Sequence, residues 1–208
     1  MKQLTAAIFA ATLLWSIAPS SIAATLAVDT GIPVAANPAQ PLIGALSLDG
    51  NNWLAGQVTF TQAVRIYSIN YWLNDNGSGG GTYTVALYDD SANLPGSLLT
   101  SATGAYAAAD SGVSGWHGIS NLFWEVNPGT YWTALEIGTN DSFSGVAPIS
   151  APFPLAHYAF NDGSGYAVTS KAIGVQVAVP EPPTVWLLIP ALVVLGRLSR
   201  HHPNRPIH

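Results

Sequence analysis

The chain has 208 residues, of which 49% are hydrophobic and only 8% are charged, and its formal net charge is −5. This composition does not fit a disordered chain, which needs low hydrophobicity and high net charge, and it is a poor match to a cytosolic enzyme. The sequence contains no cysteine, which excludes disulfides, thiol nucleophiles and cysteine-based metal or iron–sulfur sites.

Charge is distributed unevenly along the chain. Arg197, Arg200 and Arg205 lie in the last 12 positions, and Lys2 lies near the start. Residues 24–179 carry ten acidic and two basic residues, a net charge of −8. Because such an acidic segment is repelled by phosphate, we do not expect it to bind nucleic acid.

The first 23 residues have the pattern of a secretory signal peptide. Lys2 precedes a mostly apolar run from Leu4 to Ala18, and Pro19 and small residues follow as far as Ala23. A charged start, a short apolar segment and a small-x-small site are the marks of a cleaved signal. We predict a signal helix in residues 1–23, cleavage after Ala23 and export. A retained membrane anchor is the alternative.

Residues 24–179 show the two-residue alternation that is typical of strands. Apolar residues alternate within five segments, 67–73, 83–87, 122–126, 131–137 and 173–179. Each alternation gives one apolar face that can be buried, and turn-forming residues separate the segments. We predict an all-β exported domain over these residues, a jelly-roll-like antiparallel β-sandwich of eight or nine strands.

Two parts of this domain resemble the sandwiches of carbohydrate-binding modules in secreted bacterial proteins. They are the segments from Leu87 to Leu99 and from Asn127 to Leu135. The resemblance implies a fold more than it implies a ligand.

The C-terminal segment has the pattern of a short membrane anchor. An apolar run of about 15 residues from Thr184 to Leu198 would extend roughly 22 Å as a helix, short of the ~30 Å hydrocarbon core. Arg197 and Arg200 can extend its reach by snorkelling, and their charge keeps that end cytoplasmic. We predict a single C-terminal transmembrane helix that leaves residues 24–179 outside. A buried helix of the globular domain is the alternative.

The tripeptide Pro180-Glu181-Pro182, the apolar run and the arginine cluster together resemble the PEP-CTERM sorting signal of exported proteins in Gram-negative bacteria that make extracellular polysaccharide. The resemblance implies that residues 180–208 are a sorting signal, with this tripeptide as the processing motif. It also implies that Arg197 and Arg200 are the membrane stop.

The same resemblance implies a partner and a destination. The partner is exosortase, a membrane-embedded cysteine transpeptidase that cuts near the Pro-Glu-Pro motif. The destination is the cell surface or the extracellular matrix. Two features depart from the family pattern: Pro183 stands where a small residue is usual, and the tail continues past the arginines to His208.

Enzyme motifs are absent from the sequence. There is no G-x-S-x-G, H-E-x-x-H, Walker or G-x-G-x-x-G pattern, and the two histidines of residues 24–179 cannot build a three-histidine metal site. The best glycosidase-like pair is Glu125 and Glu136. A hairpin at Pro128-Gly129 would place these carboxylates roughly 13 Å apart, beyond the usual separation of about 5–9.5 Å. We predict no catalytic residues and a protein that is not an enzyme.

Calcium is the one metal that the sequence leaves open. Two loops offer the hard oxygen ligands that Ca²⁺ prefers: Asn74, Asp75 and Asn76 in one, and Asp89, Asp90 and Asn93 in the other. The same residue types are the usual turn formers, and the spacing of a calcium loop is absent. We therefore predict no cofactor and no metal site, with Ca²⁺ as the alternative.

Sugar is the ligand for which the sequence offers candidate contacts. Trp116 and His117, in a glycine-flanked segment, could stack on a sugar ring and hydrogen-bond to it. The alternative is that the tryptophans fill the core, as the alternation predicts for Trp124.

Three functions remain open for the exported domain. The first is a non-enzymatic surface or matrix component associated with biofilm or exopolysaccharide. The second is a lectin domain like a carbohydrate-binding module, and the third is a polysaccharide-acting enzyme. The directions of Trp53, Trp116 and Trp132 separate them, because a solvent-facing pair favours the second.

Overall fold

The computed structural model describes residues 24–33, 45–48, 52–75, 79–138 and 140–181. Residues Ala24–Pro180 form one compact unit. The expected signal peptide, the C-terminal apolar run, Pro182, Arg197 and Arg200 lie outside the described residues. Within the described ranges, no helix is long and apolar enough to span a bilayer.

Strands dominate the described part of the chain, which also has a short 3-10 helix, η2 (Ala108–Asp110). The strands are β1 (Ala24–Asp29), β2 (Ala45–Leu48), β3 (Trp53–Phe60), β4 (Val64–Asp75), β5 (Gly81–Asp90), β6 (Pro95–Tyr106), β7 (Gly115–Val126), β8 (Gly129–Glu136), β9 (Gly145–Pro148), β10 (Tyr158–Asn161), β11 (Tyr166–Thr169) and β12 (Val175–Pro180). This is more than the eight or nine expected, because β2, β9, β10 and β11 have four residues each, too few for a clear alternation.

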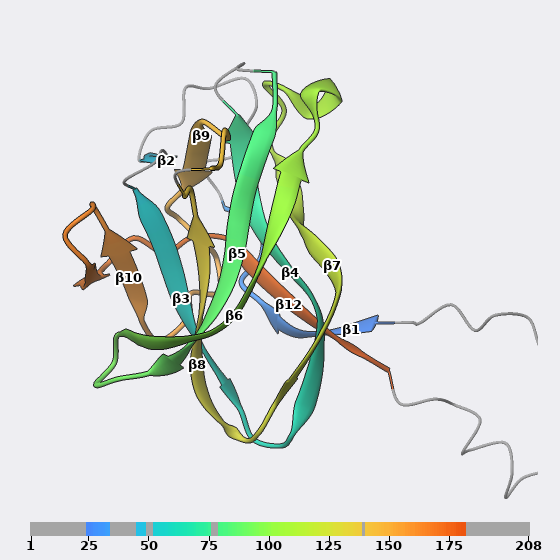
Figure 1. The fold of residues 1–208 in the computed structure, drawn as a ribbon, viewed down its shortest axis with the longest axis vertical. Helices are drawn as coiled ribbons and strands as arrows, with labels where there is room; N and C mark the ends of the chain where they lie inside the picture. The colour runs from blue at the N-terminus through green and yellow to red at the C-terminus, as the bar shows by residue number, and fades with distance from the viewer. Residues whose placement is uncertain (1–23, 34–44, 49–51, 76–78, 139, 182–208) are drawn as a thin grey trace, which may run out of the picture. The chain divides into compact units, whose positions relative to one another are not determined.

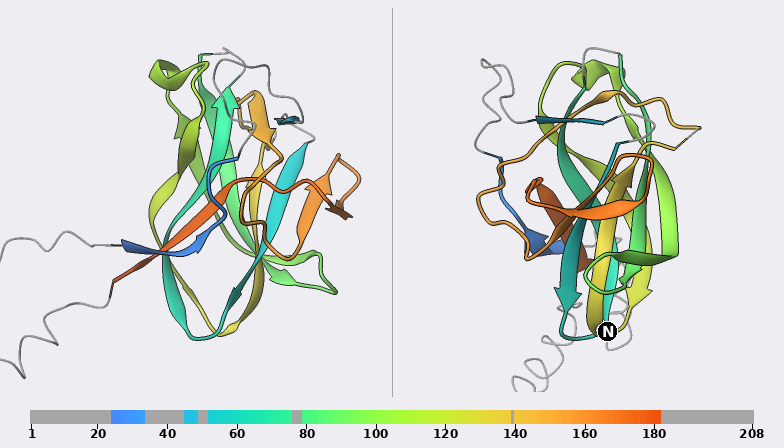
Figure 2. Two further views of the ribbon diagram at one scale, coloured as in Figure 1. Left: turned by 180° about the vertical axis from the view of Figure 1, so that it is seen from behind. Right: turned by 90° about the vertical axis from the view of Figure 1, so that its left-hand side faces the viewer.

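The strands form two sheets of six (Figures 1 and 2). One has the order β1-β12-β4-β9-β2, with β7 also paired to β4, and the other has the order β11-β10-β3-β8-β5-β6. Every pairing between these strands is antiparallel. The domain is therefore all-β, as predicted, and its two sheets are consistent with a β-sandwich.

The inner faces of both sheets supply one hydrophobic core. Alternate residues of four of the five predicted segments line this core and are at most 2% exposed: Ile69, Tyr71, Leu73, Tyr83, Val85, Leu87, Thr133, Leu135, Ile137, Ile173, Val175 and Val177. Tyr67, Tyr131 and Val179, at the ends of these segments, are only half-buried, and the opposite face is not exposed throughout, because Ala86, Trp132 and Ala134 are buried in a second cluster. Within the core, the hydroxyl of Tyr71 in β4 lies 2.6 Å from the Thr133 Oγ1 in β8. This hydrogen bond joins the two sheets.

A β-bulge between β4 and β7 interrupts the strand pairing at Tyr67 and at the start of the segment 122–126. Trp124 pairs with Ile66 and Ser120 pairs with Ser68, so the three residues from Asn121 to Phe123 lie opposite Tyr67 alone. The backbone of Asn121 and Phe123 has positive φ, at 60° and 53°. Trp124 pairs with the core residue Ile66 and packs against the core, but it is only half-buried, so its expected core position is confirmed in part.

The segment Asn127-Pro128-Gly129 does not close the hairpin that the sequence suggested. Strand β7 pairs with β4 in one sheet, whereas β8 lies between β3 and β5 in the other. The turn therefore carries the chain from one sheet to the other, and the separation of Glu125 and Glu136 derived from a hairpin register does not apply.

Candidate functional site

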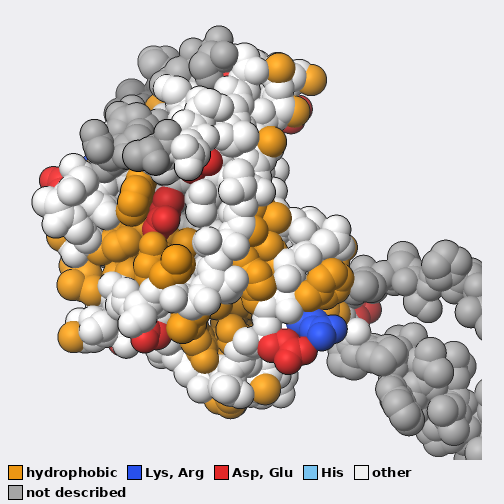
Figure 3. Space-filling model, in the orientation of Figure 1, with side chains coloured by type: hydrophobic (Ala, Val, Ile, Leu, Met, Phe, Trp, Pro, Cys, Tyr) orange, Lys and Arg blue, Asp and Glu red, His pale blue; other side chains and the backbone are white. Residues whose placement is uncertain are grey.

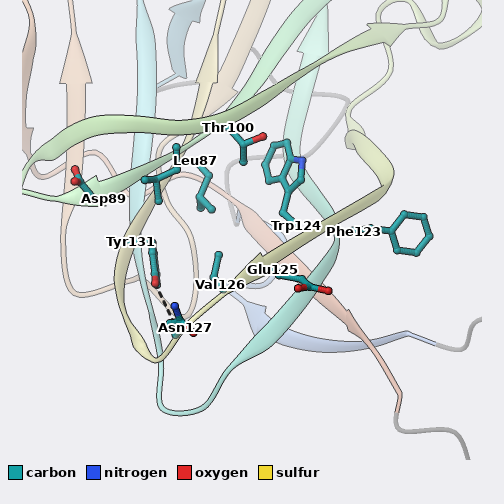
Figure 4. A pocket seen from close by; sticks show the side chains of 10 residues that line it. Leu87, Asp89, Thr100, Phe123, Trp124, Glu125, Val126, Asn127 and Tyr131 are labelled. Atoms are coloured by element: carbon teal, nitrogen blue, oxygen red, sulfur yellow. Dashed lines mark hydrogen bonds between the residues drawn. The ribbon is translucent and has the colours of Figure 1, made fainter.

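A groove opens where β5 and β6 of one sheet approach β7, and it continues to the start of β8 (Figure 4). Its volume is about 640 Å³, within the range of about 300–1,000 Å³ that is usual for ligand sites. Its lining residues are Leu87, Asp89, Leu99, Thr100, Phe123, Trp124, Glu125, Val126, Asn127 and Tyr131.

Each of the long walls of the groove contains a β-bulge. In β6, Thr100 pairs with Leu87 and Leu98 pairs with Tyr88, so Leu99 has no partner residue and is 50% exposed. In β7, the bulge ends next to Trp124. Bulges redirect side chains and are common beside binding sites, so this feature favours a functional role for the groove.

Aromatic side chains lie inside and beside the groove. In Figure 4, Trp124 points into the space between β7 and β6, toward Thr100, whereas Phe123 points away from it. Tyr131 is held by its hydroxyl, which donates to the Asn127 carbonyl at 3.0 Å, and its ring packs 6.2 Å from that of Phe60. The groove thus offers two half-buried aromatic rings in fixed positions.

Polar side chains surround these rings. Asp89 accepts a hydrogen bond from the Ser97 backbone N–H. Glu125 forms an ion pair with Arg65 at 2.7 Å, and both side chains are more than half exposed. The Arg65 guanidinium also lies 5.7 Å from the centre of the Phe123 ring.

A second cavity of about 520 Å³ continues from the groove. It shares Glu125, Val126 and Asn127 with the first and adds Arg65 and its neighbours Ala63 and Val64. The two cavities therefore meet at the end of β7.

The predicted sugar contacts Trp116 and His117 lie on the same strand, β7, but they do not line the groove. The ring of Trp116 packs edge-to-face on Trp72 at 5.3 Å, and the ring of His117 stacks on Tyr106 at 3.9 Å. Burial lowers the pKa of His117. Both side chains are half-buried, so these ring contacts occupy part of their surface.

The other two tryptophans of interest face the protein, so Trp53, Trp116 and Trp132 do not supply the solvent-facing pair that would favour a carbohydrate-binding module. Trp132 is fully buried, and its Nε1 donates to the Asp90 carboxylate at 2.8 Å. Trp53 donates to the Ile137 carbonyl at 3.0 Å and packs against Tyr166. The groove-lining Trp124, for which the sequence predicted a core position, is the tryptophan best placed for a ligand.

Asn76 lies outside the described residues, and the other candidate calcium ligands hold loops together. Asp75 is 1% exposed and accepts hydrogen bonds from the Gly80 N–H, the Ser111 hydroxyl and the Gly112 N–H. Asp90 accepts from Trp132 and from Gln57, and the bond from Trp132 is the main cause that lowers its pKa. In the part of the chain that the structure describes, no group of three or more histidine or acidic side chains is placed to hold a metal.

A second feature that the sequence did not reveal covers the outer face of β3, β8 and β5. Tyr88 and Tyr166 both donate to Glu136 Oε1, at 2.5 and 2.8 Å, over a layer of buried alanines and Trp132. Burial raises the pKa of both tyrosines. Figure 3 shows that hydrophobic side chains gather on this face, with acidic side chains among them. Glu136 is only 8% exposed and lines neither cavity.

No family model, no curated protein and no solved structure matches this chain.

Proposed function

We propose that this domain is the non-catalytic, polysaccharide-binding part of an exported surface or matrix protein. The observation that carries the proposal is the groove, in which Trp124 and Tyr131 lie among the oxygen-bearing side chains of Asp89, Glu125 and Asn127. Sugar rings present apolar faces that stack on aromatic rings and hydroxyls that bond to carboxylates and amides. A groove that combines both is suited to a sugar chain.

The environments of Glu125 and Glu136 do not suit the pair of catalytic carboxylates that the sequence offered. Glycoside hydrolysis needs two carboxylates that flank one sugar bond. Glu125 is paired with Arg65 at the surface, and Glu136 is buried beneath two tyrosine hydroxyls outside the groove. We propose that neither acts as a catalytic residue and that binding needs no cofactor or metal.

The exported and sorted nature of the protein forms part of the proposal. It rests on the N-terminal signal pattern and on Pro180-Glu181-Pro182 with the apolar run and the Arg197 and Arg200 cluster behind it. Exosortase is the partner that the resemblance implies, and a biofilm or exopolysaccharide matrix is the proposed destination. A polysaccharide-binding domain suits that destination.

We also propose a jelly-roll-like path for the chain. The chain changes sheets repeatedly, from β3 to β4, from β4 to β5, from β6 to β7 and from β7 to β8. Such crossings between two antiparallel sheets support a jelly roll over two consecutive meanders.

The binding proposal is tested with the full chain and the host's own extracellular polysaccharide. Trp124→Ala should weaken binding about tenfold, since a stacked aromatic ring contributes on the order of 1 kcal/mol or more. Trp116→Ala is the matched control, because it removes an indole of the same strand outside the groove. Equal losses in both variants would contradict the assignment of the groove, and no binding by the unaltered protein would overturn the proposal.

Sorting is tested by the intact mass of the protein recovered from the native cell surface. We expect a form that begins at Ala24 and ends near Pro182, and we expect it to be lost when Pro180, Glu181 and Pro182 are all changed to Ala. A surface form that keeps the tail through His208 in both proteins would show a permanent anchor and refute processing at the motif.

A further inference from the structure

We propose that the groove selects a polysaccharide that carries free amino groups and rejects polyanionic chains. This inference rests on the proposed polysaccharide binding and names the chemical class of the ligand.

Carboxylates line opposite walls of the groove. In Figure 4, Asp89 lies at one end of the labelled side chains, next to Leu87, and Glu125 lies on the opposite wall, between Val126 and Phe123. The carboxylate of Glu125 is well exposed. A sugar ring stacked on Trp124 would therefore lie in a groove that two carboxylates line, where an ammonium group on the sugar gains most. Glu125 shares its charge with Arg65, so Asp89 carries the uncompensated negative charge.

The basic side chains in the described part of the chain are already engaged by neighbouring side chains. Its two basic side chains, other than histidine, are Arg65 and Lys171. Arg65 is paired with Glu125 and lies over Phe123, and Lys171 lies 5.0 Å from the ring centre of Phe160. Neither lines the 640 Å³ groove, and Arg65, which lines the adjoining cavity of about 520 Å³, has its charge compensated by Glu125. Carboxylate, sulfate or phosphate groups on a polysaccharide are usually held by the forked donors of arginine or by lysine, and the groove presents neither.

The net negative charge of the whole domain also favours a cationic polysaccharide over an anionic one. With ten acidic and two basic residues between positions 24 and 179, it repels a polyanion before contact and attracts a polycation. Single exposed ion pairs contribute little, but a polymer with an amine on each sugar repeats the interaction along the chain. The selectivity should therefore be clear at low salt and weaken at high salt.

The test compares three sets of oligosaccharides of equal length with the full chain. The probes are chitosan oligomers with free amines, chitin oligomers in which the amines are acetylated, and oligogalacturonate as the anionic set. With the amines protonated, we expect the chitosan oligomers to bind at least about tenfold more tightly than the chitin oligomers and oligogalacturonate not to bind. Raising the salt from about 0.1 M to about 1 M shortens the Debye length from about 10 Å to about 3 Å, so it should remove most of that difference.

Charge-neutral variants locate the effect in the groove. Asp89→Asn should lower the affinity for chitosan oligomers about two- to fivefold, as expected for an exposed ion pair, and Glu125→Gln, which also leaves Arg65 without its partner, should do the same. Both changes should lower the affinity for chitin oligomers less. Asp162→Asn is the control, because this carboxylate lies in the exposed turn between β10 and β11 and outside the groove. The control should change neither affinity.

The outcomes distinguish the charge selectivity from the polysaccharide binding on which it rests. Equal binding of chitosan and chitin oligomers through Trp124 would overturn the charge selectivity and leave polysaccharide binding in place. Tightest binding of oligogalacturonate would also overturn it. No effect of Trp124→Ala on any bound probe would overturn both the inference and the assignment of the groove.

Discussion

We predict that Tyr71 and Thr133 are energetically coupled through the hydrogen bond between their hydroxyls. Tyr71 is 1% exposed and Thr133 is fully buried, and their oxygens lie 2.6 Å apart between the two sheets. Tyr71→Phe leaves the threonine hydroxyl buried without this partner, and Thr133→Val does the same to the tyrosine hydroxyl. Each single change should lower the free energy of unfolding by about 1–3 kcal/mol. The double change, which removes both polar groups, should cost less than the sum of the two.

The measurement is a double-mutant cycle by urea unfolding, followed by tryptophan fluorescence. The denaturant slope should stay constant across the four proteins, so that shifts of the midpoint report stability. Thr130→Val is the control: its Oγ1 lies 3.2 Å from that of Thr59 in an exposed pair, and the change should stay within about 0.5 kcal/mol. Additive single effects, or single effects as small as the control, would refute the reasoning.

The remaining predictions concern pH and the turn between β5 and β6. Burial raises the pKa of Tyr83 from its ordinary value of 10.0 to about 12, and burial also raises the pKa of Tyr71. The folded state therefore binds these protons more tightly, so stability is intact below pH 10 and falls as the pH rises above it, by up to about 1.4 kcal/mol per pH unit for each tyrosine. Tyrosinate absorbance and fluorescence should change together in an alkaline titration, and ionisation of every tyrosine near pH 10 in a folded protein would contradict this. Ala92 has a φ of 54° in this turn, so Ala92→Gly should relieve strain and raise the free energy of unfolding by about 0.5–1 kcal/mol, seen as a melting temperature higher by about 1–4 °C. A lower melting temperature would count against strain at Ala92.

Local patterns were sufficient to predict the fold class and much of the core. The alternation at Tyr83, Val85 and Leu87 is present in the structure because a regular strand turns every second side chain inward, whatever its partner. The same holds for Val175 and Val177 at the other end of the domain. A period of two depends on the backbone alone, so it can be identified without knowing which strands pair.

Turn-forming residues were less informative about connectivity. The sequence Asn127-Pro128-Gly129 correctly marks the end of one strand and the start of the next. A turn signal does not say whether the two strands pair with each other or enter different sheets, because both need the same local backbone reversal. The sequence-based hairpin at this point failed for that reason.

By itself, the sequence determined an all-β chain and a domain of strongly negative charge, because composition and strand periodicity are local properties. Only the tertiary structure decided where the groove lies. Leu99 is left without a partner by a bulge in β6, and Trp124 lies beside a bulge in β7, a strand of the other sheet; a bulge depends on how a strand is paired with its neighbour. Trp124 packs against the core opposite Ile66 and yet lines the groove, because among the described strands β7 pairs with β4 alone and the groove opens along its other side.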